Sequence, residues 1–190
     1  MELIKTGRST LCISDSTDVR KLLTLCDAYV SPLLSIRPEL VVYGKKCNQN
    51  RNVSFFSNAS SGYTYSGTKS HSMKLNDSLF KLLEYVNNRF NACYNGILVN
   101  KYIDGKDYIG AHSDSEIGLD VHRGVICVST GVLRKFRIRG KLSKKIICDI
   151  ETLDFIQMKG DFQNEFTHEI PKQLKVKGER VSYTFRYHRT

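Results

Sequence analysis

The sequence predicts an α+β protein with N-terminal helices and a jelly-roll core, that is, a double-stranded β-helix. Two observations carry this prediction. Helical apolar stripes lie before residue 96, and about eight short strand-like runs follow from residue 97 onward, separated by turn residues such as Gly and Asp. At 190 residues the chain is long enough for one domain with a substantial core.

Two segments have the apolar spacing of an amphipathic helix, residues 19–30 and residues 76–90. Ser16 or Thr17 is the expected N-cap of the first helix, and Asn76 is the expected N-cap of the second. We therefore expect a helical N-terminal segment over residues 1–46, followed by a further helix before the strands begin.

Residues 47–72 form a polar segment rich in Asn, Ser and Gly that also contains Tyr63 and Tyr65. A long polar segment with aromatic side chains inside one domain is often a binding loop or a lid. The alternative is a flexible surface excursion without a function.

The strand-like runs cover residues 97–103, 107–113, 124–130, 133–139, 146–150, 153–158, 166–170 and 180–187. Helices followed by this number of short strands are typical of a jelly-roll sandwich. The mouth of such a barrel can hold a metal ion and a co-substrate away from bulk water. We take residues 97–187 as the catalytic core of a single domain that spans residues 1–190.

The most informative motif is His112-Ser113-Asp114, with His168 and Arg180 further along the chain. Two imidazoles and one carboxylate can occupy one face of an iron octahedron and leave the other positions open, as in non-haem Fe(II) oxygenases. A dicarboxylate co-substrate such as 2-oxoglutarate also needs a fixed cation, and arginine meets a carboxylate bidentately. The order His-x-Asp, His, Arg supplies all of these groups.

Alternation of period two divides the last run into a polar and an apolar face. The polar face carries Arg180, Ser182, Thr184 and Arg186, and the apolar face carries Val181, Tyr183, Phe185 and Tyr187. Taken alone, a polar face is usually turned to water. Taken with the upstream histidines and aspartate, it fits the wet interior of a barrel that holds an anion.

The composition points to a polyanionic partner inside a cell. The formal net charge is +10, from 29 basic and 19 acidic residues, which favours nucleic acid, although a merely soluble basic protein is the alternative. The 6 cysteines contain no C-x-x-C pair, so we expect free thiols in a reducing, intracellular compartment. No apolar run is long enough to predict a membrane span.

Two further groups of charged or titratable residues have open interpretations. Lys135, Arg137 and Arg139 alternate with apolar residues and could meet a phosphate backbone, but a solvated outer face is equally compatible. The remaining histidines lack ligand-like spacing with a carboxylate, so we expect surface or structural roles for them. They are His71, His122 and His188.

With these residues placed, the chain resembles the AlkB family of Fe(II)- and 2-oxoglutarate-dependent dioxygenases, most closely its nucleic-acid repair branch. The matching stretch runs from about Phe55 to Arg186 and covers most of the chain. It contains Tyr-Thr-Tyr-Ser-Gly at 63–67, Asn-Lys-Tyr-Ile-Asp-Gly at 100–105, the His-x-Asp motif, His168, and the Arg-x-x-x-Thr-x-Arg element that ends the stretch.

The resemblance implies iron binding by His112, Asp114 and His168, and a contact from Arg180 to the distal carboxylate of 2-oxoglutarate. It also implies that the co-substrate pocket is completed by Asn100, Tyr102, Ser182, Thr184 and Arg186. Ser182 departs from the asparagine that the family often carries. The chain also lacks the tryptophan that relatives often have after the Tyr-rich segment.

By the same resemblance, Tyr65 and the His112 ring would sandwich an extruded base, with Tyr63, Ser66 and Glu116 near its edge or backbone. A flipped base needs an aromatic face and a polar partner, and its extrusion costs a few kcal/mol. For Glu116 taken alone, a solvated loop carboxylate is the alternative.

The implied activity is oxidative demethylation of bases such as 1-methyladenine and 3-methylcytosine in DNA or RNA, with O2 and 2-oxoglutarate as co-substrates. We expect a monomer that prefers single-stranded nucleic acid. Two other functions stay open: a hydroxylase of the same chemistry that acts on a protein or small molecule, and a non-catalytic nucleic-acid binder.

Overall fold

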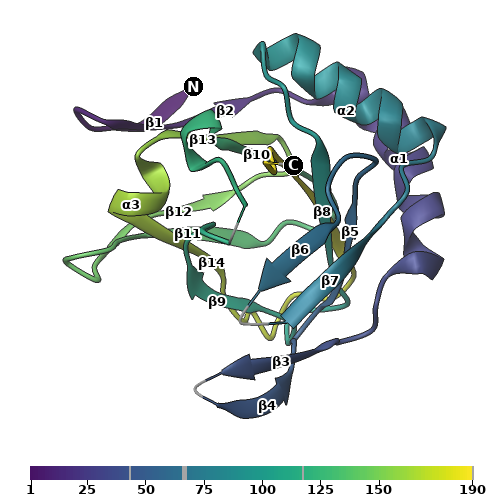
Figure 1. Ribbon diagram of the computed structural model, residues 1–190. Coiled ribbons are helices and arrows are strands. Elements are labelled where there is room, and N and C mark those ends of the chain that lie inside the picture. Colours follow the sequence, from purple (N-terminus) through teal and green to yellow (C-terminus); the bar gives the residue numbers. More distant parts are fainter. Residues whose placement is uncertain (43, 66–67, 117, 190) are drawn as a thin grey trace.

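The computed structural model describes residues 1–42, 44–65, 68–116 and 118–189, apart from the side chains of Val42 and Tyr65. Within these ranges the chain forms two facing β-sheets, two helices that cover one of them, and a separate β-hairpin (Figure 1). This mostly β arrangement agrees with the predicted jelly-roll.

The larger sheet has nine strands. In spatial order they are β1 (Glu2–Lys5), β2 (Ser9–Ser14), β13 (Phe155–Gly160), β10 (Val125–Gly131), β15 (Arg180–Arg186), β8 (Gly96–Tyr102), β5 (Asn52–Phe56), β7 (Thr68–Met73) and β6 (Gly62–Tyr65). The smaller sheet contains β12 (Ile146–Glu151), β11 (Lys135–Gly140), β14 (Phe166–Ile170) and β9 (Ile109–His112). Each of the eight strands predicted after residue 96 overlaps one of these strands.

Helices α1 (Arg20–Val30) and α2 (Asp77–Phe90) pack on the outer face of the larger sheet. Their apolar stripes bury residues such as Leu23 and Leu82 against Tyr183 and Phe185 of β15. The side chain of Asn76 accepts a hydrogen bond from the backbone N of residue 79 at 3.0 Å, so the predicted cap of α2 is confirmed. The two helices therefore hold the apolar face of β15 in place.

The expected cap of α1 is wrong. Ser16 and Thr17 lead into a 3-10 turn, η1 (Thr17–Val19), rather than directly into the helix. The Ser16 hydroxyl instead donates to Asp154 Oδ1 at 2.8 Å, because the adjoining strand brings that carboxylate close. Further short helical turns are η2 (Ser31–Leu33), η3 (Val121–Arg123) and α3 (Phe162–Glu165).

The expectation of a helical segment over residues 1–46 is correct only for part of it. β1 and β2 form a hairpin, and β2 pairs antiparallel with β13 from Ser9 to Ser14. Leu11 is fully buried between the two sheets, which gives this hairpin its anchor. Near the other end of the segment, β3 (Glu39–Val42) pairs with β4 (Lys45–Asn48) as the separate hairpin.

The segment 47–72 is also more regular than the predicted loop. It contains β5, which lies inside the larger sheet, and the β6–β7 hairpin at the edge of that sheet. The sequence did not predict these strands, because a segment rich in Ser, Asn and Gly has the same composition whether it forms turns or polar strands. The β6–β7 hairpin crosses the front of the barrel in Figure 1.

The polar face of β15 turns inward between the sheets, as the sequence predicted. Strand register sets its neighbours, because Ser182 pairs with Asn100 and Arg180 pairs with Tyr102 across β15 and β8. The apolar face packs under the helices instead. No helix in the described part of the chain is long and apolar enough to cross a membrane.

Candidate iron and co-substrate site

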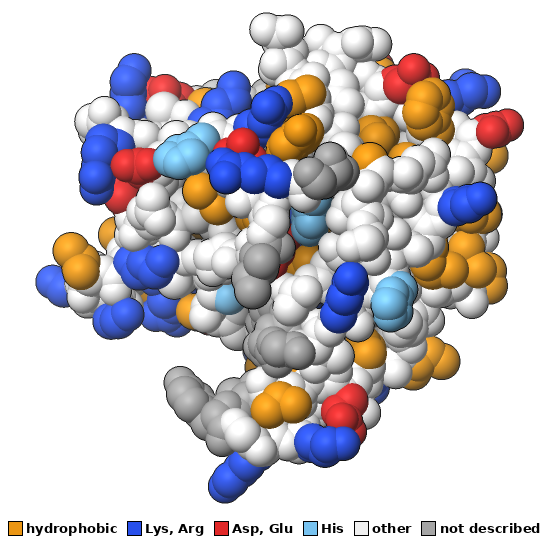
Figure 2. Space-filling view, in the orientation of Figure 1, with side chains coloured by type: hydrophobic (Ala, Val, Ile, Leu, Met, Phe, Trp, Pro, Cys, Tyr) orange, Lys and Arg blue, Asp and Glu red, His pale blue; other side chains and the backbone are white. Residues whose placement is uncertain are grey.

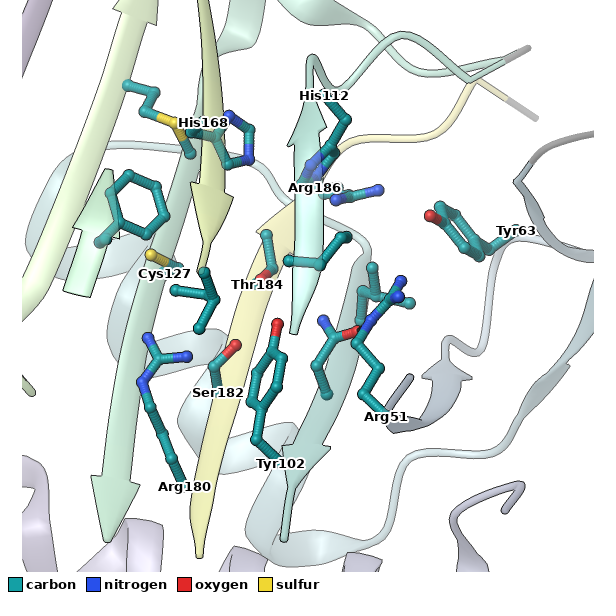
Figure 3. Close-up of a pocket in the computed structure, with 16 residues that line it drawn as sticks. Arg51, Tyr63, Tyr102, His112, Cys127, His168, Arg180, Ser182, Thr184 and Arg186 are labelled. Carbon is teal, nitrogen blue, oxygen red and sulfur yellow. Dashed lines mark hydrogen bonds between the residues drawn. The ribbon is translucent and has the colours of Figure 1, made fainter. Parts of the chain in front are cut away.

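A cluster of two imidazoles and one carboxylate lies at one end of the barrel interior. His112 ends β9, Asp114 follows it in a loop, and His168 lies in β14, where strand register pairs it with His112. One ligand atom from each of the three residues can be chosen so that all lie within 4.8 Å of one another. Figure 3 shows the two histidines side by side above the pocket. The predicted metal ligands are therefore brought together by the fold.

Neighbouring groups hold each ligand in place. His112 Nδ1 lies 2.9 Å from the carbonyl oxygen of Gly110, which can accept a hydrogen bond from Nδ1–H, and in that tautomer the ring lone pair is on Nε2. The Asp114 backbone N donates to Gln163 Oε1 at 2.8 Å, and the Phe136 ring stacks on His168 at 5.2 Å. Such contacts orient metal ligands before the metal arrives.

Burial keeps both histidines neutral. It lowers the pKa of His112 to about 3, with the neighbouring His168 as a second cause, and it lowers the pKa of His168 to about 3, with Arg186 as the second cause. Neutral imidazole is the form that binds a metal ion, so no proton needs to leave at neutral pH.

Arg186 makes two contacts that the sequence did not predict. Its guanidinium donates to Asp114 Oδ1 at 2.5 Å and also to Glu116 Oε1. Asp114 Oδ2 has no hydrogen-bond partner among the described residues, so this oxygen is the one left for a metal ion. The predicted contact of Arg186 with 2-oxoglutarate stays a prediction, although its side chain does line the pocket.

At the other end of the pocket, Arg180 is a buried cation that makes no ion pair with any described residue. Its side chain is 2% exposed, and Nε and Nη1 have no hydrogen-bond partner in the described part of the chain. Burial lowers the pKa of its guanidinium, and the guanidinium carbon lies 5.6 Å from the centre of the Tyr102 ring. A buried charge of this kind is costly unless an anion pairs with it.

The space between the metal ligands and Arg180 is a pocket inside the barrel. Its walls include every residue that the resemblance assigned to the co-substrate, namely Asn100, Tyr102, Arg180, Ser182, Thr184 and Arg186. A chelating group at one end and an unpaired guanidinium at the other suit a short dicarboxylate. Figure 3 shows Arg180 at the opposite end of this pocket from His112 and His168.

Sequence reasoning missed Arg51, which also lines the pocket. Its side chain is 2% exposed, and its Nε donates to Asn100 Oδ1 at 2.6 Å. This bond holds the amide of Asn100 against the β5 side of the barrel. A lone arginine in a polar stretch just before β5 gave no signal, because only the fold brings residue 51 beside residue 100.

A second chamber adjoins the metal ligands on the outer side. It is lined by Tyr63, Thr64, His112, Ser113, Asp114, Ser115 and Glu116. Tyr63 is 4% exposed, and burial raises its pKa above the ordinary value. Two of the residues predicted to touch a base, Tyr63 and Glu116, are thus beside the metal site. Ser66 and the side chain of Tyr65 lie outside the described residues.

Comparison with known proteins decides the family. Residues 11–186 match the model of the 2OG-Fe(II) oxygenase superfamily. The chain belongs to the 2OG-Fe(II) oxygenase superfamily. The curated relatives are AlkB homologues, which agrees with the resemblance seen in the motifs.

Among these relatives, the DNA oxidative demethylase ALKBH2 of Arabidopsis thaliana is 27% identical over 79% of this chain and 57% of its own length. Human ALKBH2 is also 27% identical, over 76% of this chain and 59% of its own length. The mouse alkB homolog 3 is 30% identical over 57% of this chain and 41% of its own length. The chain thus spans less than two thirds of the length of each of these relatives.

The solved structure of OsALKBH1 has the same fold, with a TM-score of 0.56 and 13% identity over 97% of this chain and 100% of that one. The residues present also fit the superfamily's iron and 2-oxoglutarate. Among the described residues, the donor set is two neutral imidazoles and a carboxylate oxygen without a hydrogen-bond partner, and the buried Arg180 makes no ion pair.

The basic strand β11 differs from the expected ladder of free cations. Arg137 pairs with Asp149 at 2.7 Å and with Glu169 at 3.4 Å, and Arg139 pairs with Glu169 at 2.9 Å. Lys135 lies 3.7 Å from Asp149. Strands β12 and β14 flank β11, and their acidic side chains neutralise much of its charge. Contact with phosphate by these three residues stays a prediction, with a smaller contribution than the sequence suggested because of these ion pairs.

Proposed function

We propose that this 2OG-Fe(II) oxygenase oxidatively demethylates N-alkylated nucleobases, such as 1-methyladenine and 3-methylcytosine, in DNA or RNA. The observation that carries this proposal is the chamber in which Tyr63 and Glu116 lie beside the metal ligands. An aromatic ring and a carboxylate around one small space match the face and the polar edge of an extruded base. The AlkB relatives, among them the ALKBH2 demethylases, support the same substrate class.

In this mechanism His112, Asp114 and His168 would hold the iron, and Arg186, which binds Asp114 Oδ1, would leave Oδ2 for the metal. Arg180 pairs with the distal carboxylate of 2-oxoglutarate, and the buried strands around it exclude water. When bound, iron, 2-oxoglutarate and O2 would supply the oxidation that hydroxylates the methyl carbon, with release of CO2, succinate and then formaldehyde.

Glu116 would select among lesions through the edge of the base. Adenine and cytosine carry an exocyclic amino donor, whereas guanine and thymine present a carbonyl oxygen at the equivalent position. A carboxylate accepts a hydrogen bond from the amino group and is repelled by the oxygen. We therefore expect 1-methyladenine and 3-methylcytosine to be preferred over 1-methylguanine and 3-methylthymine.

The test is formaldehyde release from single-stranded oligonucleotides that carry one of these four lesions, in DNA and in RNA, with Fe(II) and 2-oxoglutarate present. Formaldehyde from the two amino-bearing lesions is the expected result. An absence of formaldehyde from every methylated oligonucleotide would refute the proposal and promote a protein or small-molecule substrate.

We also propose that the β6–β7 hairpin acts as the nucleotide-recognition lid, with Tyr65 stacked on the target base. Base stacking is typically worth about 1–3 kcal/mol per base, so Tyr65→Ala should lower kcat/KM for demethylation about 5- to 150-fold. Tyr65→Phe keeps the ring and is the matched control. Equal losses of demethylation and of uncoupled 2-oxoglutarate consumption would show that Tyr65 supports the fold or the co-substrate site instead.

The net charge of +10 supports a nucleic-acid partner, and we propose a preference for single strands, because an unpaired base avoids most of the extrusion cost. Affinity for a methylated single strand should fall steeply as salt rises. Replacing Lys135, Arg137 and Arg139 with Gln should change the salt slope little, since acidic partners already compensate these cations. If the slope of log affinity against log salt concentration instead drops by about 3, the three cations do contact phosphates.

A further inference from the structure

Residues 187–189 follow the last strand and lie beyond the stretch that matches the superfamily model. They run alongside the loop that carries Glu116. The backbone N of Asp120 donates to the carbonyl oxygen of residue 187 at 2.9 Å, and the backbone N of residue 189 donates to Gly118 O at 2.8 Å. Leu119 and His188 also form an isolated antiparallel β-bridge. The tail therefore braces the loop between the metal ligands and η3.

Asn95 clamps the same tail from the other side. Its Nδ2 donates to the carbonyl oxygen of His188 at 2.7 Å, and its Oδ1 accepts from the His188 backbone N at 2.8 Å. These two bonds involve only the His188 backbone, so they survive a change of its side chain. The position of residue 188 is thus set independently of what the imidazole does.

The His188 imidazole is buried next to Glu116, one of the residues that line the chamber. It is 2% exposed, and its ring centre lies 4.8 Å from that of Phe55. Its Nε2 lies 3.6 Å from Glu116 Oε1 and has no hydrogen-bond partner in the described ranges. A buried ring nitrogen without a partner calls for an explanation, because such a group costs free energy.

Arg186 approaches the same carboxylate oxygen as His188. The ion pairs and hydrogen bonds that reach Glu116 from other described side chains all end on Oε1. None of these side-chain contacts ends on the second oxygen, Oε2, and Glu116 lines the chamber. Two groups on Oε1 restrict the rotation that would exchange the two oxygens.

We propose that His188 is a positioning residue for substrate selection, which holds Glu116 with one oxygen on Arg186 and the other facing the base. This inference rests on the proposed function, because Glu116 selects a base only if a base enters the chamber. It replaces the structural or surface role expected for His188 from the sequence.

The protonation of His188 is consistent with this role. Burial, followed by the nearby Arg186, lowers the pKa of His188 to about 4, so the ring is neutral at neutral pH. A neutral imidazole carries one N–H, and Nε2–H would point to Glu116 when the carboxylate closes the remaining gap on a bound base.

The test compares 1-methyladenine with 1-methylguanine in the same single strand, because the two bases differ at position 6 in an amino group and an oxygen. His188→Phe keeps the ring beside Phe55 and removes both nitrogens, whereas His188→Gln places an amide N–H near the position of Nε2. His188→Asn is too short to reach Glu116, and His122→Asn, at an exposed histidine, is the matched control.

We expect His188→Phe and His188→Asn to lower the kcat/KM preference for 1-methyladenine about tenfold, mainly through a higher KM. His188→Gln should retain most of the preference, and the control should behave as the unaltered protein. In a Glu116→Gln background, His188→Phe should cause no further loss of preference, because His188 acts through that carboxylate.

Each other outcome rejects a defined claim. If His188→Phe and His188→Asn both keep the preference, or if His188→Phe lowers it equally with and without Glu116, the positioning role is wrong. If the unaltered protein releases formaldehyde from neither lesion, the proposed function fails, and the inference fails with it.

Discussion

Asp114→Ala should abolish succinate formation from 2-oxoglutarate while the protein stays folded. Asp114 supplies the only carboxylate in the metal cluster found among the described residues, and its Oδ2 has no other hydrogen-bond partner there. Its loss removes a ligand and also the charge that opposes the two-plus charge of the metal. Succinate formation and Mn(II) or Fe(II) binding should both be measured.

Folding of the Asp114→Ala protein is checked by thermal unfolding without metal. Arg186 keeps Glu116 as a partner in this variant, so we expect only a moderate loss of stability. Asp77→Ala, at an exposed position in the first turn of α2, is the control and should retain both activities. Iron-dependent succinate production that survives Asp114→Ala would show that the ligand assignment is wrong.

Arg180→Met should weaken 2-oxoglutarate binding by about 2–5 kcal/mol, because the distal carboxylate would enter a buried site without its charge partner. This corresponds to a loss of about 30-fold or more in affinity. Calorimetric titration of 2-oxoglutarate in the presence of Mn(II) measures the change. Ser182→Asn, which restores the residue common in the family, should bind 2-oxoglutarate equally well or modestly more tightly.

The same Arg180 variant makes a second, opposite prediction for stability. Burial lowers the pKa of Arg180, and two of its nitrogens lack hydrogen-bond partners in the described chain, so the unpaired cation destabilises the protein without co-substrate. Arg180→Met should therefore unfold at an equal or higher temperature than the unaltered protein, yet gain nothing when 2-oxoglutarate is added. A lower unfolding temperature together with unchanged affinity would make Arg180 a structural residue.

Most residues of the candidate site could be predicted from the sequence as one group, because the signals that mark them are local. The His-x-Asp spacing puts two ligands next to each other, and the alternation along residues 180–186 separates an inward polar face from an outward apolar one. The structure has the same division of β15, because the helices bury its apolar face and its polar face lines the pocket.

The features that escaped the sequence depend on contacts between distant segments. Arg51 meets Asn100 only because β5 pairs with β8, and Arg186 meets Asp114 and Glu116 only because the barrel closes. The acidic partners of Arg137 come from neighbouring strands that no local pattern pairs with it. From charge and spacing alone, we therefore expected more uncompensated positive charge on β11 than the structure has.

The most direct test of the central claim measures succinate and formaldehyde in one reaction, with Fe(II), 2-oxoglutarate and a single-stranded oligonucleotide that carries 1-methyladenine. We expect the two products in nearly equal amounts, and neither from the Asp114→Ala protein. Succinate without formaldehyde, at the same rate with methylated and unmethylated oligonucleotides, would contradict the assignment of this site to nucleobase demethylation.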